Sequence, residues 1–218
     1  MKTSERLFGI TAAHVIRDYE ISKRNGRRLV VQLHEALIDI ENALIAIDDD
    51  MDIATFALTE DQLALARREA FDTRPYWPPP TPKREDMVAV AGFPEIMREV
   101  RPDHSATFKA YAVFVYLSDV TKRELIVTYD PTKEDYAVTE PGPPPIDLNL
   151  SGASGGPAVL YRMFEGAASC WPVGLIAHGK GTISQGDAKA FVIVRCRRIE
   201  MIQADGTLPP KDSGWLPP

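Results

Sequence analysis

The chain has 218 residues, of which 44% are apolar and 26% are charged, fractions close to those of an average globular protein. This composition excludes a wholly disordered chain, and no run approaches the roughly 18 apolar residues of a membrane helix. The formal charge of -6, from 25 basic and 31 acidic residues, argues against a protein that binds nucleic-acid phosphates.

Short strands and one helix are expected in the first half of the chain. The helix opens at Thr59, because Thr59 and Gln62 have the spacing of a capping box and apolar residues follow on one face. Asn25-Gly26 has the residue types of a hairpin turn. Strands are predicted at residues 7–11, which lead into a short turn at 12–16, and at residues 29–33, 43–47 and 53–58.

The second half is richer in strands. Residues 76–86 contain many prolines and predict a stiff linker between a domain at 1–75 and another at 87–205. Residues 206–218 are expected to be a frayed tail. Strands are predicted at residues 87–91, 108–117, 125–129, 157–162, 173–177 and 190–195, with a short closing helix at 197–203. This pattern predicts an all-β fold, either a sandwich or a barrel.

Three short motifs follow one another in an order that indicates a particular chemistry. They are Thr11-Ala12-Ala13-His14, then Asp52-Ile53-Ala54, and last Gly152-Ala153-Ser154-Gly155-Gly156-Pro157. In these residues the chain resembles the trypsin-like serine peptidases of the chymotrypsin fold, and the resemblance covers residues 7 to 195. It implies two antiparallel β-barrels, with His14 as general base, Asp52 as its orienting carboxylate and Ser154 as nucleophile.

These residue types suit acyl transfer for physical reasons. A serine hydroxyl attacks a carbonyl carbon only when a neighbouring base takes its proton, and imidazole serves as that base near neutral pH. A buried carboxylate fixes the imidazole tautomer and stabilises the imidazolium that forms. By the resemblance, the amides of Gly152 and Ser154 hold the oxyanion, and each such donor contributes roughly 3 to 4 kcal/mol in related enzymes. Neither a metal nor an organic cofactor is implied.

The resemblance also implies where a substrate binds. Residues 172–179 resemble the strand that pairs with an extended peptide, so Ala177, His178 and Gly179 are expected to bind the substrate backbone. Leu148 and Asn149 are expected to line the specificity pocket. Leu148 stands where trypsin-type enzymes have an acidic residue, which favours an apolar or small substrate side chain over Lys or Arg. The implied partner is therefore a protein or peptide.

The chain departs from the family pattern in two places. Ala153 replaces the aspartate that pairs with a newly cut N-terminus in the animal enzymes, so this activation route is not expected. Only residues 1–6 precede the strand that leads to His14, where the family has two further strands. Either the coding start lies upstream of residue 1, or the first barrel is incomplete and holds His14 and Asp52 less firmly. Residues 1–16 do not match a secretion signal, which suggests a cytoplasmic protein.

The sequence leaves several alternatives open. Asp48, Asp49 and Asp50 compete with Asp52 for the imidazole, although only Asp52 directly enters an apolar strand. Residues 152–156 also match the G-x-S-x-G elbow of α/β-hydrolase esterases, but that elbow needs a following helix and residues 157–161 have a strand pattern. A further alternative is a catalytically weak or inactive peptidase-like domain that binds proteins.

Three single residues also have two interpretations each. His178 either lines the substrate cleft or simply ends a strand. Cys170 and Cys196 either form a disulfide across neighbouring strands or remain reduced and buried.

Overall fold

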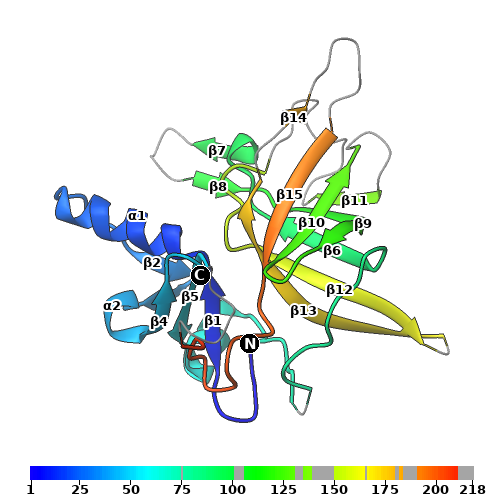
Figure 1. Ribbon diagram of the computed structural model, residues 1–218. Coiled ribbons are helices and arrows are strands. Elements are labelled where there is room, and N and C mark those ends of the chain that lie inside the picture. The colour runs from blue at the N-terminus through cyan, green and yellow to red at the C-terminus, as the bar shows by residue number, and fades with distance from the viewer. Residues whose placement is uncertain are drawn as a thin grey trace. The chain divides into compact units, whose positions relative to one another are not determined.

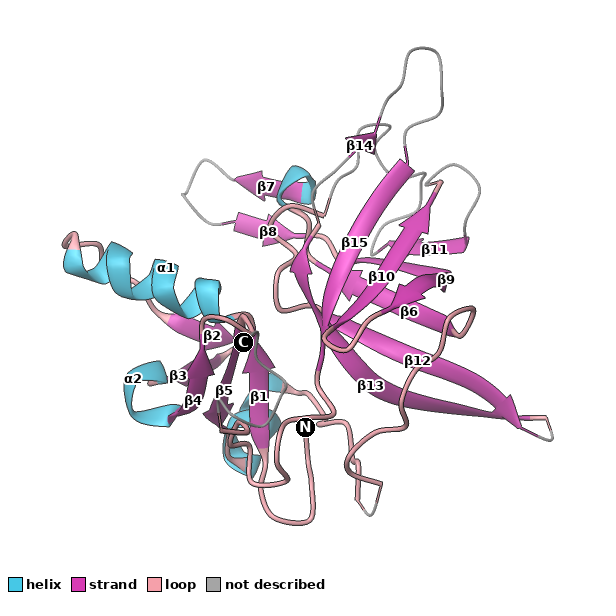
Figure 2. Cartoon of the chain, viewed as in Figure 1, coloured by secondary structure: helices cyan, strands magenta, loops and turns pink. Residues whose placement is uncertain are grey.

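The computed structural model describes residues 1–74, 76–100, 106–130, 135–138, 150–164, 166–179, 182–183 and 191–210. Contacts within the chain define two units, which are Met1–Pro80 together with residues 199–210, and Thr81–Arg198. Strands predominate among the described residues, and three α-helices, all in the first unit, accompany them (Figure 1, Figure 2).

The first unit is built on a three-stranded antiparallel sheet in the order β1-β5-β4, and a separate hairpin joins β2 to β3. The strands described in this unit do not close into a barrel, so a second barrel is not seen here. The elements are β1 (Phe8–Thr11), α1 (Ala13–Arg24), β2 (Val31–Leu33), β3 (Ala36–Ile38), α2 (Ile40–Ala43), β4 (Leu44–Asp48), β5 (Ile53–Ala57) and α3 (Glu60–Ala66).

The core of the first unit joins α1 to its sheet. Ile16 of α1, Ile40 of α2 and Ala54 of β5 are buried against one another. The segment at 199–210 completes the unit through polar contacts, because the buried Thr55 hydroxyl donates to the Gly206 carbonyl at 2.6 Å. The indole Nε1 of Trp77 likewise donates to the Ile202 carbonyl at 2.9 Å.

Residues 12–16 were expected to form a short turn, and this prediction is wrong. They begin α1, a helix of 12 residues. Asn25-Gly26 does not form a hairpin turn either: Asn25 caps the end of α1, where its amide donates to the Ile21 carbonyl, and the Gly26 amide, at φ 79°, donates to the Lys23 carbonyl. This is the usual way for a helix to end, with a left-handed residue just beyond the last turn.

The capping box at α3 is confirmed. The Thr59 hydroxyl accepts from the Gln62 amide at 3.1 Å, and the Gln62 side chain accepts from the Thr59 amide at 2.9 Å. The predicted closing helix at 197–203 is wrong, because the last strand continues to Arg198 and turns follow it. Alternating burial along that strand explains the difference, since alternation is the pattern of a strand.

The second unit is a closed antiparallel barrel of six strands. Its strands run in the order β10-β15-β13-β12-β6-β9, and β9 pairs back to β10 to close the ring. The unit also contains shorter strands and a 3-10 turn. The elements are β6 (Met87–Gly92), η1 (Glu95–Met97), β7 (Arg98–Val100), β8 (Ala106–Phe108), β9 (Tyr111–Val120), β10 (Glu124–Tyr129), β11 (Asp135–Val138), β12 (Pro157–Phe164), β13 (Ala167–His178), β14 (Thr182–Ile183) and β15 (Phe191–Arg198).

Side-chain alternation explains the barrel. Along β6 and β15 every second residue is buried in the barrel core, as Val88 and Val90 show on β6 and Val192 and Val194 on β15. The prediction of an all-β fold is confirmed for this unit. Several strands are longer than predicted, and β13 extends the expected 173–177 to twelve residues.

Candidate active site

The end of β1 and the start of β5 bring His14 and Asp52 together. Thr11 pairs with Ala54 at the last position of the β1–β5 register. In an antiparallel pair, the residues just after one strand therefore lie beside those just before the other. His14, the second residue of α1, consequently lies next to Asp52, which directly precedes β5.

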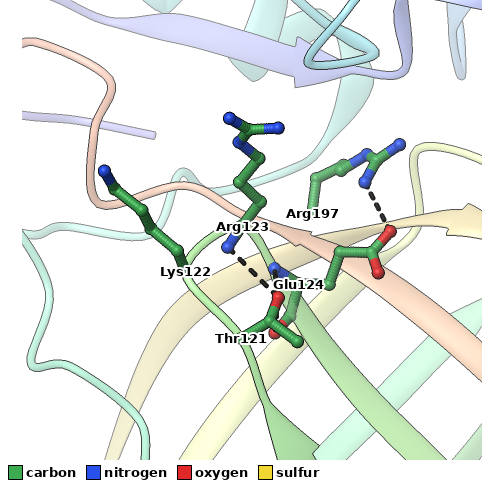
Figure 3. A pocket seen from close by; sticks show the side chains of 5 residues that line it. All are labelled: Thr121, Lys122, Arg123, Glu124 and Arg197. Carbon is green, nitrogen blue, oxygen red and sulfur yellow. Dashed lines mark hydrogen bonds and ion pairs between the residues drawn. The ribbon is translucent and has the colours of Figure 1, made fainter. Parts of the chain in front are cut away.

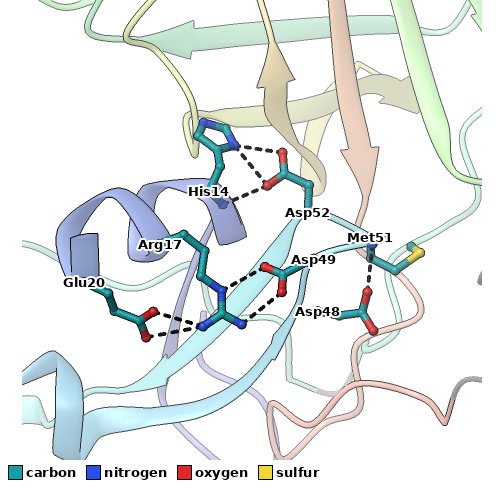
Figure 4. A network of polar contacts seen from close by, with 7 residues as sticks. All are labelled: His14, Arg17, Glu20, Asp48, Asp49, Met51 and Asp52. Atoms are coloured by element: carbon teal, nitrogen blue, oxygen red, sulfur yellow. Dashed lines mark hydrogen bonds and ion pairs between the residues drawn. The ribbon is translucent and has the colours of Figure 1, made fainter. Parts of the chain in front are cut away.

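The Asp52 carboxylate binds both N–H groups that His14 presents to it. Its Oδ1 accepts from the His14 backbone amide at 3.0 Å, and its two oxygens lie 3.0 and 2.9 Å from ring Nδ1 (Figure 4). A carboxylate accepts hydrogen bonds, so this contact selects the tautomer with the proton on Nδ1, in which the lone pair of the uncharged ring is on Nε2. The carboxylate side chain is 11% exposed, whereas the imidazole is 41% exposed.

The backbone of Asp52 is fixed by the turn between β4 and β5. Asp52 has φ 52°, in the left-handed region that Asp and Asn tolerate better than most residues. Its amide donates to the Asp49 carbonyl at 3.3 Å, and the Asp48 carboxylate accepts from the Met51 amide at 2.8 Å. Asp48 therefore caps this turn and does not face the imidazole.

Arg17 ties helix α1 to the same turn. Its guanidinium donates twice to the Asp49 carboxylate, from Nε and Nη2, at 3.0 Å each (Figure 4). Its Nη1 also donates to Glu20 at 3.1 Å. A bidentate Arg–carboxylate pair is geometrically specific, so it restrains the helix that carries His14 against the turn that carries Asp52. No local sequence pattern predicts this pair, since it depends on a helix that was not predicted.

Ser154 lies in a tight loop of the second unit, before β12. Hydrogen bonds hold the loop on both sides: the Gly155 amide donates to the Ile176 carbonyl at 2.8 Å, and the Ile176 amide donates to the Gly156 carbonyl at 2.7 Å. The Ala153 amide donates to the Leu150 carbonyl at 3.0 Å. The loop is thus fastened directly to β13.

Two amides of this loop differ from their neighbours. Those of Ala153, Gly155 and Gly156 are hydrogen-bonded, whereas those of Gly152 and Ser154 donate to no acceptor among the described residues. Gly152 has φ 83°, a left-handed backbone conformation of the kind found in turns whose N–H groups bind anions. This is the donor pair that an oxyanion would need.

Close packing explains why glycine is required at position 156. A Cβ there would lie 2.1 Å from the Ala91 carbonyl oxygen of β6, a distance that no side chain can occupy. Ala153 also packs on this strand, because a Cβ added at Gly92 would lie 2.6 Å from the Cβ of Ala153. The loop is therefore pressed onto β6 on one side and bonded to β13 on the other.

The esterase interpretation fails on local structure. A nucleophile elbow needs a helix after the serine, and Ser154 is followed by the strand β12.

The residues expected to bind substrate lie in part beside this loop. Ala177 is buried and His178 is exposed at the end of β13, where the register with β15 shifts. The Gly179 carbonyl accepts from the Leu150 amide at 3.2 Å. Leu148 and Asn149 lie outside the described residues. The structure thus brings His14 to Asp52 in the first unit, and joins the Ser154 loop to residues 176–179 in the second.

Sequence reasoning missed one residue beside the loop. The Glu95 amide donates to the Ser151 carbonyl at 2.7 Å, and a Cβ added at Gly152 would lie 3.0 Å from the Cβ of Glu95. No local pattern marks Glu95, because this contact depends on how η1 follows β6.

A different pocket opens at the turn between β9 and β10. It is lined by Thr121, Lys122, Arg123, Glu124 and Arg197 (Figure 3). The Thr121 hydroxyl accepts from the Glu124 amide at 2.9 Å, and the Glu124 carboxylate pairs with Arg195 and Arg197. The lining contains neither serine nor histidine, so we do not place the hydrolytic chemistry here.

The two cysteines do not form a disulfide bond. Both cysteines are free, with Cys170 exposed and Cys196 buried, so the disulfide alternative and a buried Cys170 are both wrong.

No helix in the described ranges is long and apolar enough to cross a membrane. Among those same residues, no three His, Cys, Asp or Glu side chains form a group able to hold a metal ion. No protein-family model matches the chain, and no curated protein sequence matches it.

Proposed function

We propose that the chain is a trypsin-like serine endopeptidase that hydrolyses bonds in proteins or peptides through an acyl-enzyme. The observation that carries this proposal is the pairing of the Asp52 carboxylate with His14, at 2.9 Å from Nδ1. That contact leaves Nε2 as the basic nitrogen of the neutral ring, which is the form a general base needs.

The serine loop supplies the second support. Ser154 lies in a segment fastened to β6 and β13, and neither its amide nor that of Gly152 has an acceptor among the residues that the structure describes. Donors that are already fixed before the reaction stabilise a developing oxyanion without reorganisation. The proposal requires Ser154 to meet Nε2 of His14, so that the three side chains act as one proton-transfer unit.

In the first half of the reaction, Ser154 Oγ attacks the carbonyl carbon of the bond to be cleaved while its proton moves to Nε2 of His14. The carbonyl oxygen becomes an oxyanion and accepts hydrogen bonds from the amides of Gly152 and Ser154. The C–N bond then breaks, and the amine leaves with the proton held by His14. An ester between Ser154 and the acyl half of the substrate remains.

Water completes the cycle. It attacks the ester carbon while His14 takes one of its protons, and the same proton then passes to Ser154 Oγ as the C–O bond breaks. The acyl half leaves as a carboxylic acid, and the enzyme returns to its starting state. Asp52 stays ionised throughout and stabilises the imidazolium of each step.

A catalytically weak or inactive peptidase-like domain that binds proteins is the second candidate. One observation favours it: His14 and Asp52 lie on a three-stranded sheet that the described residues do not close. Positional slack of about 1 Å in a catalytic group can cost roughly 100-fold in rate. The bidentate Arg17–Asp49 pair opposes such slack, which is why we favour the enzyme.

Hydrolysis by the purified protein and by its Ser154→Ala variant tests the proposal. A mixture of fluorogenic peptides that differ at the pocket-binding residue serves as substrate. We expect the unmodified protein to cleave members of this mixture and Ser154→Ala to lose at least about 1,000-fold in rate. Equal cleavage by both proteins would refute the assignment of Ser154, and a lack of cleavage by both would favour the binding domain.

A further inference from the structure

The acidic residue Glu95 lies next to Gly152, one of the two residues of the proposed oxyanion site. It begins the 3-10 turn η1, which directly follows β6, and it belongs to the same unit as the Ser154 loop. Its amide donates to the Ser151 carbonyl at 2.7 Å. Its Cβ and backbone nitrogen are both 3.0 Å from where a Gly152 Cβ would lie. The Glu95 backbone is therefore fixed against the residue whose amide is proposed to hold the oxyanion.

The carboxylate of Glu95 is exposed and has no partner among the described residues. Arg98, three positions further along the chain, forms no ion pair with it among the contacts of the described residues. Two apolar side chains stand on the same segment, since Phe93 is 53% exposed and Ile96 is 40% exposed. A carboxylate flanked by exposed apolar surface suits a Lys or Arg side chain, whose carbon stem packs while its charged end pairs.

An unneutralised carboxylate at this point opposes the reaction. Charge develops on the substrate carbonyl oxygen in the transition state, and a second negative charge nearby raises the energy of that state. A cation supplied by the substrate would remove this penalty. At a separation of about 7 Å and an effective dielectric constant of about 40 to 80, one such charge changes a rate roughly threefold to sevenfold.

We infer that Glu95 makes the site selective for peptides with Lys or Arg within two residues of the bond to be cleaved, at positions other than the one whose side chain enters the specificity pocket. An extended peptide advances about 3.4 Å per residue, so only the nearest side chains reach a carboxylate that lies beside the scissile carbonyl. The inference rests on the proposed peptidase function. It concerns positions flanking the bond and is independent of the side chain that the specificity pocket accepts.

Kinetics with matched peptides test the inference. One fluorogenic peptide frame keeps the pocket-binding residue constant and carries Lys, Gln or Glu at each other position within two residues of the bond, and kcat/KM is measured for each. For the unmodified protein we expect Lys to exceed Gln about threefold to sevenfold in at least one position, with Glu lower still. The preference should shrink in 1 M salt, where the Debye length is about 3 Å.

Two variants and a control separate charge from structure. Glu95→Gln should lose the preference, and Glu95→Lys should invert it. Glu69→Gln removes the same charge from an exposed position of the first unit and should keep the original preference. Thermal unfolding of each variant shows that the fold is retained.

The outcomes distinguish this inference from the proposed function. Cleavage with the same charge preference in the unmodified protein and in Glu95→Gln would overturn the role of Glu95 and leave the peptidase proposal standing. If the unmodified protein cleaves no peptide of the set and Ser154 is chemically unreactive, the peptidase proposal fails and the selectivity fails with it.

Discussion

The Asp52 carboxylate accepts hydrogen bonds from both the backbone amide and the imidazole of His14. The amide contact is 3.0 Å long and spans 38 positions of the sequence. It serves helix α1, because the first amides of a helix have no partner within the helix and Ala12 offers no side chain to cap them. The same carboxylate therefore caps the helix and orients the ring that the helix carries.

Replacing Asp52 by Asn tests the second of these two roles. Asn tolerates the left-handed backbone at this position and still accepts from the His14 amide, so the fold should be retained. The neutral amide no longer stabilises the imidazolium and no longer fixes its tautomer. We expect kcat to fall by about 1,000-fold to 10,000-fold, measured on any peptide that the protein cleaves.

Asp18→Asn is the matched control for that experiment, because Asp18 is an exposed carboxylate on the same helix. It should retain the original rate. If Asp52→Asn and Asp18→Asn were equally active, Asp52 would have no part in the chemistry.

Thr55→Val should lower the stability of the first unit. The Thr55 side chain is fully buried and donates to the Gly206 carbonyl at 2.6 Å. Val has nearly the same shape but cannot donate, so the carbonyl is left without its partner. The expected loss in the free energy of unfolding is about 1–3 kcal/mol, measured by denaturant titration.

Thr55→Ser provides the comparison, since it keeps the hydroxyl and loses only a methyl group. It should retain more of the stability than Thr55→Val does. The reverse order would show that the methyl group, and not the hydrogen bond, holds residues 199–210 to the sheet.

The two thiols should differ in reactivity. Burial raises the pKa of Cys196 from 9.0 to about 12, whereas Cys170 is exposed. A thiol-specific disulfide reagent at pH 8 should therefore modify one thiol in the native protein and two after denaturation. The Cys170→Ser variant should show none in the native state. Rapid modification of two thiols in the native protein would contradict the buried position of Cys196.

The raised pKa of Cys196 also sets a pH dependence. The core holds the protonated thiol, so this contribution to stability is fully present below pH 9, the unfolded value, and is lost progressively as the pH rises toward 12. Replacing Cys196 by Ala should reduce this loss of stability above pH 9. An unchanged alkaline profile in Cys196→Ala would assign the loss to other groups.

The barrel was predictable because its information is local. Alternation of buried residues such as Val88 and Val90 marks each strand, and the short distances between turn signals require many strands. Helix α1 was not predictable in the same way. Its N-terminal cap comes from Asp52, far away in the sequence, and Asn25-Gly26 at its end suits a hairpin turn equally well.

The residues of the candidate site also fall into two groups, those that a local sequence motif marks and those that come together only in the folded chain. His14, Asp52 and Ser154 were chosen from short motifs, and the structure explains why Asp52 and not Asp48 faces the imidazole: Asp48 accepts from the Met51 amide instead. Glu95 and the Arg17–Asp49 pair were missed, since both depend on elements that meet only after folding.

Labelling with a serine-reactive fluorophosphonate tests the central claim most directly, because only an activated hydroxyl reacts at a useful rate. Intact mass should increase by one adduct, peptide mapping should place it on Ser154, and His14→Ala should abolish or strongly slow the reaction. A protein that gains no adduct, or that labels Ser154 equally fast without the imidazole of His14, would contradict the proposed proton transfer.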